Sequence, residues 1–120
     1  MGLIAGEVWT YNATKPNDGL LKTRPILIVG NDLENGLKYV DINYVIISSS
    51  ADCGKYDVKL NAAEAQKMGL TRSSVIKTTK IYTGSQSKLL SKVGTLTDNI
   101  KKEFIQKYSD YQTQLISNFT

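Results

Sequence analysis

The sequence contains no histidine and only one cysteine, Cys53. The lack of histidine excludes imidazole acid–base catalysis, Ser-His-Asp nucleophiles and histidine-containing metal sites. A single cysteine can form neither an internal disulfide nor a structural zinc site. Neither a phosphate-binding P-loop pattern nor a dinucleotide glycine fingerprint occurs. An enzyme built on this chain must therefore use arginine, lysine, carboxylates, hydroxyls and tyrosine, and we expect no metal and no cofactor.

Long apolar runs are also lacking. No segment approaches membrane-spanning length, and residues 1–6 are too short and uncharged for a secretory signal. The unpaired cysteine suits a reducing compartment, so we expect a cytoplasmic protein without membrane association, with disulfide-free secretion as the alternative. The 120 residues, 41% of them hydrophobic, suit one domain that spans residues 1–120.

Carboxylates are missing from a long stretch of the second half. None lies between Glu64 and Asp98, where the chain carries six basic residues: Lys67, Arg72, Lys77, Lys80, Lys88 and Lys92. A surface of one sign favours a polyanionic partner through counterion release. The alternative is an ordinary solvated lysine-rich face, because lysines outnumber arginines 13 to 2.

Strand patterns dominate the first two thirds of the chain. Alternation predicts strands at Glu7–Tyr11 and Tyr56–Leu60, and the apolar run Pro25–Val29 predicts a strand buried on both faces. Further strands are expected at 38–48, 74–83 and 92–96. Residues 12–23 resemble a loop, and Asn35-Gly36 is a typical turn pair.

Two helices complete the predicted pattern. Asn61 is expected to cap a short helix that ends at Met68, with Gly69 as its stop. Thr97 is expected to cap a C-terminal helix of about five turns. Its apolar residues recur at helical spacing on one side: Ile100, Phe104, Tyr108, Tyr111, Leu115 and Phe119. Many short strands with two helices predict a mainly β fold with some α structure, built as a small, strongly curved sheet or barrel.

Five segments together resemble the PemK/MazF/Kid family of toxins. They are Gly6–Trp9, Lys22–Asp32, Val45–Ser49, Ser74–Thr83 and Lys92–Leu96, and they follow one another in the family's order and spacing. The resemblance implies an SH3-like barrel with a short helix after the mid-chain strands and a C-terminal helix. It also implies a homodimer, an endoribonuclease acting on single-stranded RNA, an antitoxin partner, and DNA binding by the toxin–antitoxin complex.

Arg24 is the first candidate catalytic residue. Cleavage of RNA by its own 2′-hydroxyl passes through a phosphorane with added negative charge, which a planar guanidinium can contact through two oxygens. The equivalent arginine is catalytic in family members whose motif matches. The alternative is a structural ion pair with Glu7 or Asp32. Ser48 is the second candidate, because the family places a Thr or Ser hydroxyl beside the scissile phosphate at this strand end. Ser49 and Ser50 leave its register open.

The general base is not assigned by the sequence. Many family members carry an acidic residue in the loop before the Arg-Pro pair, where this chain offers only Asp18. Some carry an acid in the strand where this chain has Thr79, with Lys77 nearby. Asp18, Lys77 or a water could serve as the base, with Thr79 in support, and a barrel of reduced or lost activity is the alternative.

RNA contacts are expected from Arg72, Lys80 and Lys88, and from Tyr82 as a ring on which a base could stack. Trp9 and the other tyrosines are expected in the core or on a helix face. A non-catalytic barrel that binds RNA or protein remains the competing hypothesis. A gyrase-poisoning toxin of the same fold is disfavoured, because its activity depends on a C-terminal tryptophan and the only tryptophan here is Trp9.

Overall fold

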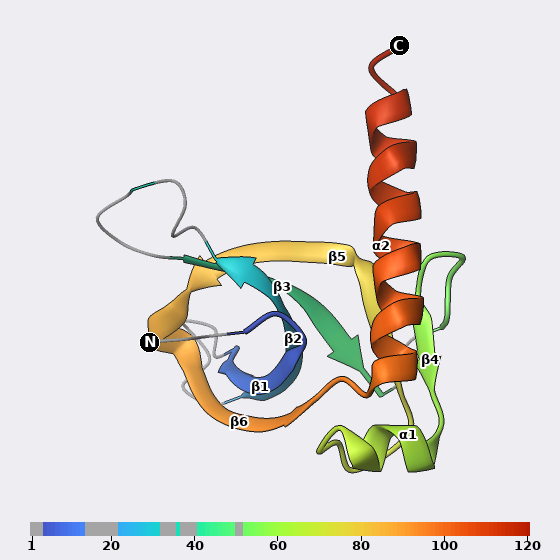
Figure 1. The fold of residues 1–120 in the computed structure, drawn as a ribbon. Helices are drawn as coiled ribbons and strands as arrows, with labels where there is room; N and C mark the ends of the chain where they lie inside the picture. Colours follow the sequence, from blue (N-terminus) through green and yellow to red (C-terminus); the bar gives the residue numbers. More distant parts are fainter. Residues whose placement is uncertain (1–3, 14–21, 32–35, 37–40, 50–51) are drawn as a thin grey trace.

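The computed structural model describes residues 4–13, 22–31, 36, 41–49 and 52–120. The elements in these ranges are, in chain order, β1 Glu7–Asn12, β2 Thr23–Asn31, β3 Asp41–Ser48, β4 Val58–Leu60, α1 Ala62–Lys67, β5 Ser74–Ser85, the 3-10 turn η2 Gln86–Lys88, β6 Leu89–Thr95 and α2 Asp98–Ser117. The strands form one six-stranded sheet in the order β4-β5-β3-β2-β1-β6 (Figure 1). Each neighbouring pair is antiparallel.

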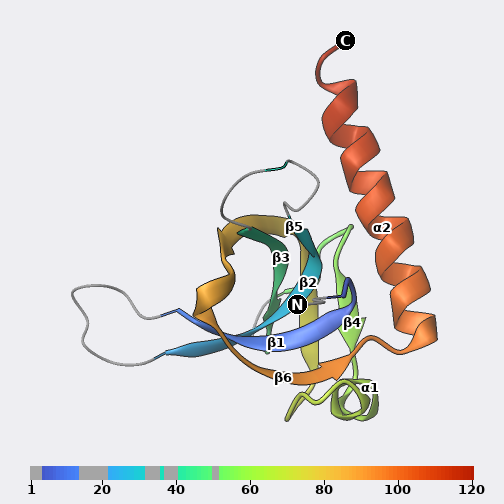
Figure 2. The ribbon, with the colours of Figure 1, turned by 60° about the vertical axis from the view of Figure 1, so that its left-hand side comes forward.

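The sheet curls into a small barrel. β5 and β6 follow one another in the chain but lie near opposite edges of the sheet, and η2 joins them. The strands accordingly wrap around a common centre, and α2 lies outside the ring they form (Figure 1, Figure 2). The predicted small barrel with a short middle helix and a C-terminal helix is confirmed.

A bulge bends β5. Val45 of β3 pairs with Ile81, but the next residue, Ile46, pairs with Lys77, so residues 78–80 have no partner in β3. Such an insertion increases the local bend and twist of a strand. The first half of β5 is therefore placed between β3 and β4, and the second half turns along β3 toward η2.

Two apolar clusters occupy opposite faces of the sheet, as the continuous run in β2 predicts. Leu27 belongs to the larger cluster, which also contains Met68 near α1 and Phe104 of α2. Its neighbours Ile26 and Ile28 belong to the smaller cluster, with Tyr11 and Ile42. Because successive side chains of a strand point to opposite faces, β2 separates the two clusters.

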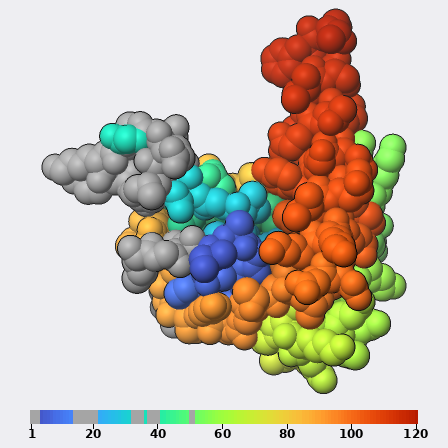
Figure 3. All heavy atoms as spheres, viewed as in Figure 1, coloured from blue at the N-terminus to red at the C-terminus, as the bar shows by residue number. Residues whose placement is uncertain are grey.

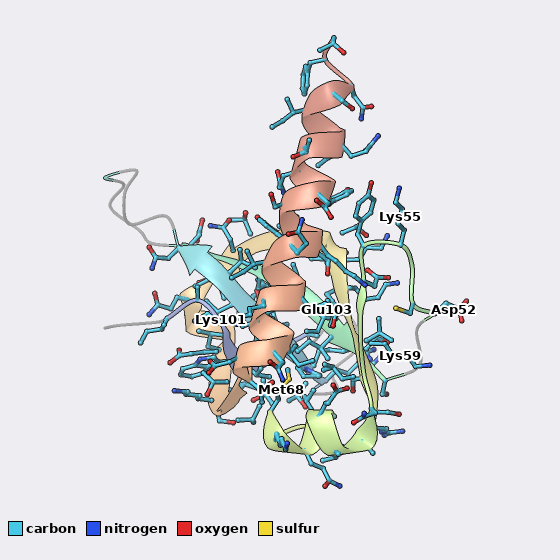
Figure 4. All side chains as sticks on the ribbon, turned by 45° about the vertical axis from the view of Figure 1, so that its right-hand side comes forward. Asp52, Lys55, Lys59, Met68, Lys101 and Glu103 are labelled. Atoms are coloured by element: carbon cyan, nitrogen blue, oxygen red, sulfur yellow. The ribbon has the colours of Figure 1, made fainter. Side chains whose placement is uncertain are left out.

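The two helices follow the predicted caps with one exception. In α1 the Asn61 side chain accepts a 2.8 Å hydrogen bond from the Glu64 amide, and the Glu64 carboxylate accepts one from the Asn61 amide at 2.9 Å. Gly69 then ends the helix with φ +83°, and a side chain there would collide with the Val93 carbonyl of β6. Met68 consequently lies at the foot of α2 (Figure 4). Thr97 is the N-cap of α2 but makes no side-chain cap hydrogen bond.

The apolar side of α2 packs over only part of its length. Ile100 and Phe104 are buried, whereas Leu115 is 36% and Phe119 92% exposed. The C-terminal half of the helix stands clear of the barrel (Figure 1, Figure 3). The apolar side predicted for this helix therefore packs on the barrel only over the first half of α2, because the barrel beneath it is shorter than the helix. None of the helices in the described ranges is long and apolar enough to cross a membrane.

Among the described residues, three strands begin at other residues than predicted. β2 begins at Thr23, two residues before Pro25, and pairing with β3 starts only at Ile26, so the missing proline N–H leaves no gap in that ladder. β4 begins at Val58 rather than Tyr56. β6 starts at Leu89, three residues before the predicted Lys92. Of the predicted turn pair, Gly36 has φ +66° and Asn35 lies outside the described residues.

The late start of β4 has a local cause. The Asp57 carboxylate accepts a 2.8 Å hydrogen bond from the Gly54 amide, and the Asp57 amide donates to the Gly54 carbonyl at 3.1 Å. These two bonds fold residues 54–57 into a turn, so the chain becomes extended only after Asp57. Tyr56 of this turn contacts Tyr111 of α2, with the ring centroids 5.3 Å apart.

Candidate functional site

A groove of about 930 Å³ opens on the side of the barrel that carries the smaller apolar cluster. Its walls come from the end of β1, the start of β2, the end of β3 and the segments 70–74 and 82–88. Arg24, Ser48, Arg72, Tyr82 and Lys88, all predicted as site residues, line this groove.

Strand alternation places Arg24 and Ser48 on the same face of the sheet. Arg24 is in phase with Ile26 in β2, and Ser48 is in phase with Ile46 in β3. Ile26 and Ile46 are direct partners. Two residues further along this antiparallel register, Arg24 and Ser48 occupy corresponding positions. The guanidinium and the hydroxyl are thus presented from neighbouring strands.

Arg24 is not the partner of Glu7. The Glu7 carboxylate, 7% exposed, binds Lys92 Nζ at 2.9 Å and accepts hydrogen bonds from Trp9 Nε1 at 3.1 Å and from the Ile4 amide at 3.2 Å. Arg24 itself is exposed, and within the described ranges its guanidinium forms no ion pair. Asp32, the other partner considered, lies outside the described residues.

The Glu7 pKa reflects a balance between burial and hydrogen bonding. Burial alone would raise the pKa of this carboxyl group. The hydrogen bonds from Lys92, Trp9 and the Ile4 amide, together with the Lys92 charge, outweigh burial and lower the pKa below its ordinary value. The Glu7 carboxylate is therefore ionised at neutral pH and neutralises Lys92.

The groove is electropositive. The chain has two arginines, Arg24 and Arg72, and both line it, together with Lys88. No carboxylate is among the described residues of the lining. The three cations therefore face one another across a surface of polar and aromatic side chains.

Not every basic residue of the acid-free stretch reaches this groove. Lys77 Nζ lies 2.7 Å from the Asp57 carboxylate and 2.9 Å from the Asp52 carbonyl oxygen, so a carboxylate earlier in the chain neutralises it. Lys92 is paired with Glu7. The six basic residues between Glu64 and Asp98 therefore do not form one basic surface, as the sequence had suggested. Folding brings carboxylates from other segments to two of them, Lys77 and Lys92.

Three other candidates lie outside the groove or outside the described residues. Thr79 and Lys80 belong to the unpaired part of β5, and neither they nor Lys77 line the groove. Asp18 lies outside the described residues. Across the described ranges, no three side chains of the histidine, cysteine, aspartate or glutamate type gather where they could hold a metal ion.

The structure adds two residues that sequence reasoning did not assign to the groove, Tyr11 and Tyr44. Tyr11 is the cross-strand partner of Arg24, and Tyr44 is that of Tyr82. Strand alternation contained the signal, because Tyr11 is in phase with Trp9 in β1 and Tyr44 is in phase with Ser48 in β3. The pairing of strands that are distant in sequence was needed to bring these rings to the groove.

The chain was compared with known proteins. The family described as PemK-like, MazF-like toxin of type II toxin-antitoxin system matches residues 4–107. No curated protein matches in sequence. Solved structures with the same fold include an endoribonuclease in complex with its cognate antitoxin from a mycobacterial species, at a TM-score of 0.67, 16% identity and coverage of 91% of this chain and 93% of that one.

Two further solved structures share the fold. The MazE-MazF structure from Deinococcus radiodurans has a TM-score of 0.68 and 17% identity, covering 91% of this chain and 94% of that one. The Mycobacterium tuberculosis toxin MazF-mt6 has a TM-score of 0.61 and 17% identity, covering 85% and 93%. At these identities the structures establish the fold, whereas the family match over residues 4–107 establishes kinship. This chain belongs to the family of PemK-like and MazF-like toxins of type II toxin–antitoxin systems.

Proposed function

We propose that this protein is a metal-independent endoribonuclease that cleaves single-stranded RNA with the substrate's own 2′-hydroxyl as the nucleophile, and that it inhibits growth when its antitoxin is absent. One observation carries the proposal: the only two arginines of the chain line the same groove as Ser48, and Arg24 and Ser48 each lie two residues beyond the paired Ile26 and Ile46. Family membership supports the reaction class.

The proposed reaction needs little beyond positioning and charge. The 2′-oxygen attacks the adjacent phosphorus, and the bond from phosphorus to the 5′-oxygen of the next nucleotide breaks. The products are a 2′,3′-cyclic phosphate and a 5′-hydroxyl. Arg24 would stabilise the added charge on the non-bridging oxygens and could donate a proton to the leaving oxygen. Ser48 would hold the scissile phosphate by a hydrogen bond.

The residue that removes the proton from the 2′-hydroxyl is a separate question. Lys77 is held by Asp57, and Thr79 does not line the groove, so the geometry favours neither as the base. Asp18 and water remain the candidates of this proposal. If water is the base, the chain itself contributes electrostatic stabilisation and substrate alignment.

The test is cleavage of a long unpaired RNA by the purified protein in the presence of EDTA. Arg24→Ala should slow cleavage roughly 100-fold or more, by analogy with loss of an oxyanion-hole donor. Lys80→Ala is the matched control, because it removes one exposed cation that does not line the groove. Cleavage that EDTA abolishes and magnesium restores would contradict the mechanism.

The products and the substrate form give a second readout. Fragments should carry a 5′-hydroxyl, and a 2′-O-methyl group at the cut nucleotide should block scission. Annealing the RNA to its complement should protect it, because an A-form duplex does not present splayed bases. Tight RNA binding with no cleavage under any condition would instead support the alternative, a non-catalytic RNA-binding barrel.

The proposed partners are a second copy of the chain and an antitoxin. The solved structures with this fold include an endoribonuclease in complex with its cognate antitoxin and a MazE-MazF structure. An acidic, partly disordered antitoxin segment that folds on binding would be attracted to a groove with three cations and would cover Arg24. Titration with such an antitoxin should inhibit cleavage in proportion to the amount bound.

A further inference from the structure

Three tyrosines from three strands form a stack at the side of the groove. The ring centroids of Tyr11 and Tyr44 are 4.8 Å apart with an interplanar angle of 36°, and those of Tyr44 and Tyr82 are 5.8 Å apart at 24°. Tyr11 comes from β1, Tyr44 from β3 and Tyr82 from β5, and all three line the groove. The stack therefore runs from the buried side of the sheet to the groove surface.

The inner part of this stack is fixed in place. Tyr11 is only 8% exposed. Burial raises the pKa of Tyr44, and a hydrogen bond with Tyr11 raises it further, so the Tyr44 hydroxyl stays neutral. A Cβ at Gly84 would collide with the Tyr11 hydroxyl and press on the Tyr44 ring. The absence of a side chain at Gly84 thus leaves the space that the two rings fill.

The outer end of the stack is open. Tyr82 is 45% exposed, although its other face rests on Tyr44. Within the described ranges no other aromatic ring contacts Tyr82. An exposed ring whose other face rests on the half-buried Tyr44 ring loses little conformational freedom when a planar ligand covers it. Such a ring is suited to accept one more aromatic plane.

Two cations of the groove belong to the segments on either side of Tyr11, the inner ring of the stack. Tyr11 pairs across the sheet with Arg24 in β2 and, on its other side, with Leu89, the residue that follows Lys88. A nucleic acid strand alternates phosphates with flat bases. The chemistry of this part of the groove follows the same alternation: a cation for one phosphate, an aromatic face for a base, and a cation for the next phosphate.

We propose that Tyr82 is the stacking platform for the unpaired base of a nucleotide next to the scissile phosphate, with Tyr44, Tyr11 and Gly84 as the residues that position it. Lys88 binds the phosphate on the far side of that nucleotide from Arg24. This inference rests on the proposed ribonuclease function and adds the base subsite of the same groove. Stacking is tolerant of base identity, so the platform contributes affinity and alignment more than sequence specificity.

Affinity measurements separate this inference from the cleavage mechanism. A short RNA with one mapped cut site, blocked there by 2′-O-methylation, is titrated against each variant by fluorescence anisotropy. Tyr82→Ala should weaken binding on the order of 10-fold to 100-fold, while Tyr82→Phe should bind within about 2-fold of wild type, because the ring is kept. Tyr111→Ala, which removes an aromatic ring from α2 outside the groove, is the matched control.

Abasic nucleotides identify the stacked base. At one position beside the cut site, removing the base should weaken wild-type binding about as much as Tyr82→Ala does. The same removal should cost the Tyr82→Ala variant nothing further, because the partner ring is already gone. Thermal denaturation by circular dichroism checks that the variants are folded.

Two results would overturn the platform. One is a Tyr82→Ala variant that binds RNA as tightly as wild type. The other is an affinity loss from Tyr82→Ala that adds in full to the loss from base removal at every abasic position. Failure of the proposed function has a different signature. If the wild-type protein cleaves no RNA, the affinity comparison is run on an uncleaved pool of random single-stranded RNA. If Tyr82→Ala binds this pool more weakly than wild type and Tyr82→Phe binds it as tightly as wild type, the platform is supported without cleavage. Equal affinity of wild type, Tyr82→Ala and Tyr82→Phe refutes it.

Discussion

The catalytic role proposed for Arg24 depends on the geometry of its charge more than on the charge itself. A lysine there would keep the positive charge but could not contact two phosphorane oxygens with one rigid plane. We therefore expect Arg24→Lys to recover little of the activity lost in Arg24→Ala. Single-turnover rates with saturating protein check this, because they separate the chemical step from binding.

Arg72 offers the matched comparison for this prediction. It lines the same groove from the segment between α1 and β5, away from the Arg24–Ser48 register. Arg72→Lys should retain most of the cleavage rate, since a simple phosphate contact depends on charge. Equal losses from Arg24→Lys and Arg72→Lys would contradict a distinct catalytic role for Arg24.

Glu7 shows how one residue can couple folding to pH. Its pKa is lowered in the folded protein from an ordinary value of 4.5, so the folded state favours the ionised carboxylate. Its contribution to stability is therefore complete above about pH 4.5 and is lost as the pH falls through the lowered folded value. Glu7→Gln leaves Lys92 without its partner and should lower the free energy of unfolding at pH 7 by about 1–3 kcal/mol.

The measurement is urea denaturation of wild type and Glu7→Gln at pH 7 and at pH 3. The gap between the two proteins should shrink at pH 3, below the ordinary pKa of 4.5, because the proton that the unfolded chain binds there offsets part of the contribution of the ionised carboxylate. Asp110→Asn, a change on the exposed side of α2, is the control that should give no gap at either pH. A gap that stays constant with pH would show that the effect comes from packing rather than from ionisation.

At the scale of elements, strand periodicity explains why part of the site could be predicted from the sequence. Alternation places Arg24 in phase with Ile26 and Ser48 in phase with Ile46, and a buried β2 next to β3 then brings the two polar ends together. The same reasoning fails in β5. A bulge of residues 78–80 breaks the alternation, so Tyr82, which follows the bulge, cannot be assigned to a face by counting from Ser74.

The turn before β4 is the other feature that the sequence concealed. The alternating pattern predicts that Asp57 is a polar residue of a strand, yet its side chain forms an ion pair with Lys77 and the residue is only 2% exposed. Its backbone carbonyl also accepts a 2.8 Å hydrogen bond from Lys107 of α2. These contacts join β4, β5 and α2, and none of them is local in sequence. Lys77 therefore serves the packing of three elements, which a motif alignment cannot reveal.

A substitution at Lys77 separates a structural role from a catalytic one. Lys77→Met removes the cation from a nearly buried carboxylate and should cost about 3 kcal/mol of unfolding free energy. Cleavage per folded molecule should stay close to wild type, because Lys77 does not line the groove. Denaturant melts give the first quantity, and initial rates well below the melting temperature give the second. A variant that is as stable as wild type but inactive would reinstate Lys77 as the general base.

At the scale of the whole molecule, folding sorts the charges that the sequence presents as one basic stretch. Lys77 and Lys92 are neutralised by carboxylates from other segments, while Arg24, far away in the chain, joins Arg72 and Lys88 in the groove. Three of the 15 basic residues of the chain therefore lie in one groove, whose described lining contains no carboxylate. Composition indicated a polyanionic partner, but only the fold brings Arg24 to the same groove as Arg72 and Lys88.

Self-association is expected from the apolar side chains that one copy leaves exposed. Ile105, Ile116 and Phe119 of the C-terminal segment are 56%, 66% and 92% exposed. A two-fold dimer would cover part of such surface. Light scattering at micromolar concentration should give a mass near twice 13.3 kDa. A monomer at that concentration would contradict the expectation. The salt dependence of RNA binding tests separately whether a bound strand contacts one groove or two.

The salt dependence follows from the number of cations that a bound strand contacts. One groove offers Arg24, Arg72 and Lys88, and single-stranded nucleic acid releases about 0.7 counterion per contact, which gives a slope of about −2 in log affinity against log salt. A strand that crosses both grooves of a dimer should give about −4. Arg72→Ala should then reduce the slope by about 0.7 per groove crossed, whereas Lys80→Ala should leave it unchanged because Lys80 does not line the groove. Binding that is insensitive to salt, or equally altered by both substitutions, would show that the groove is not the surface that binds RNA.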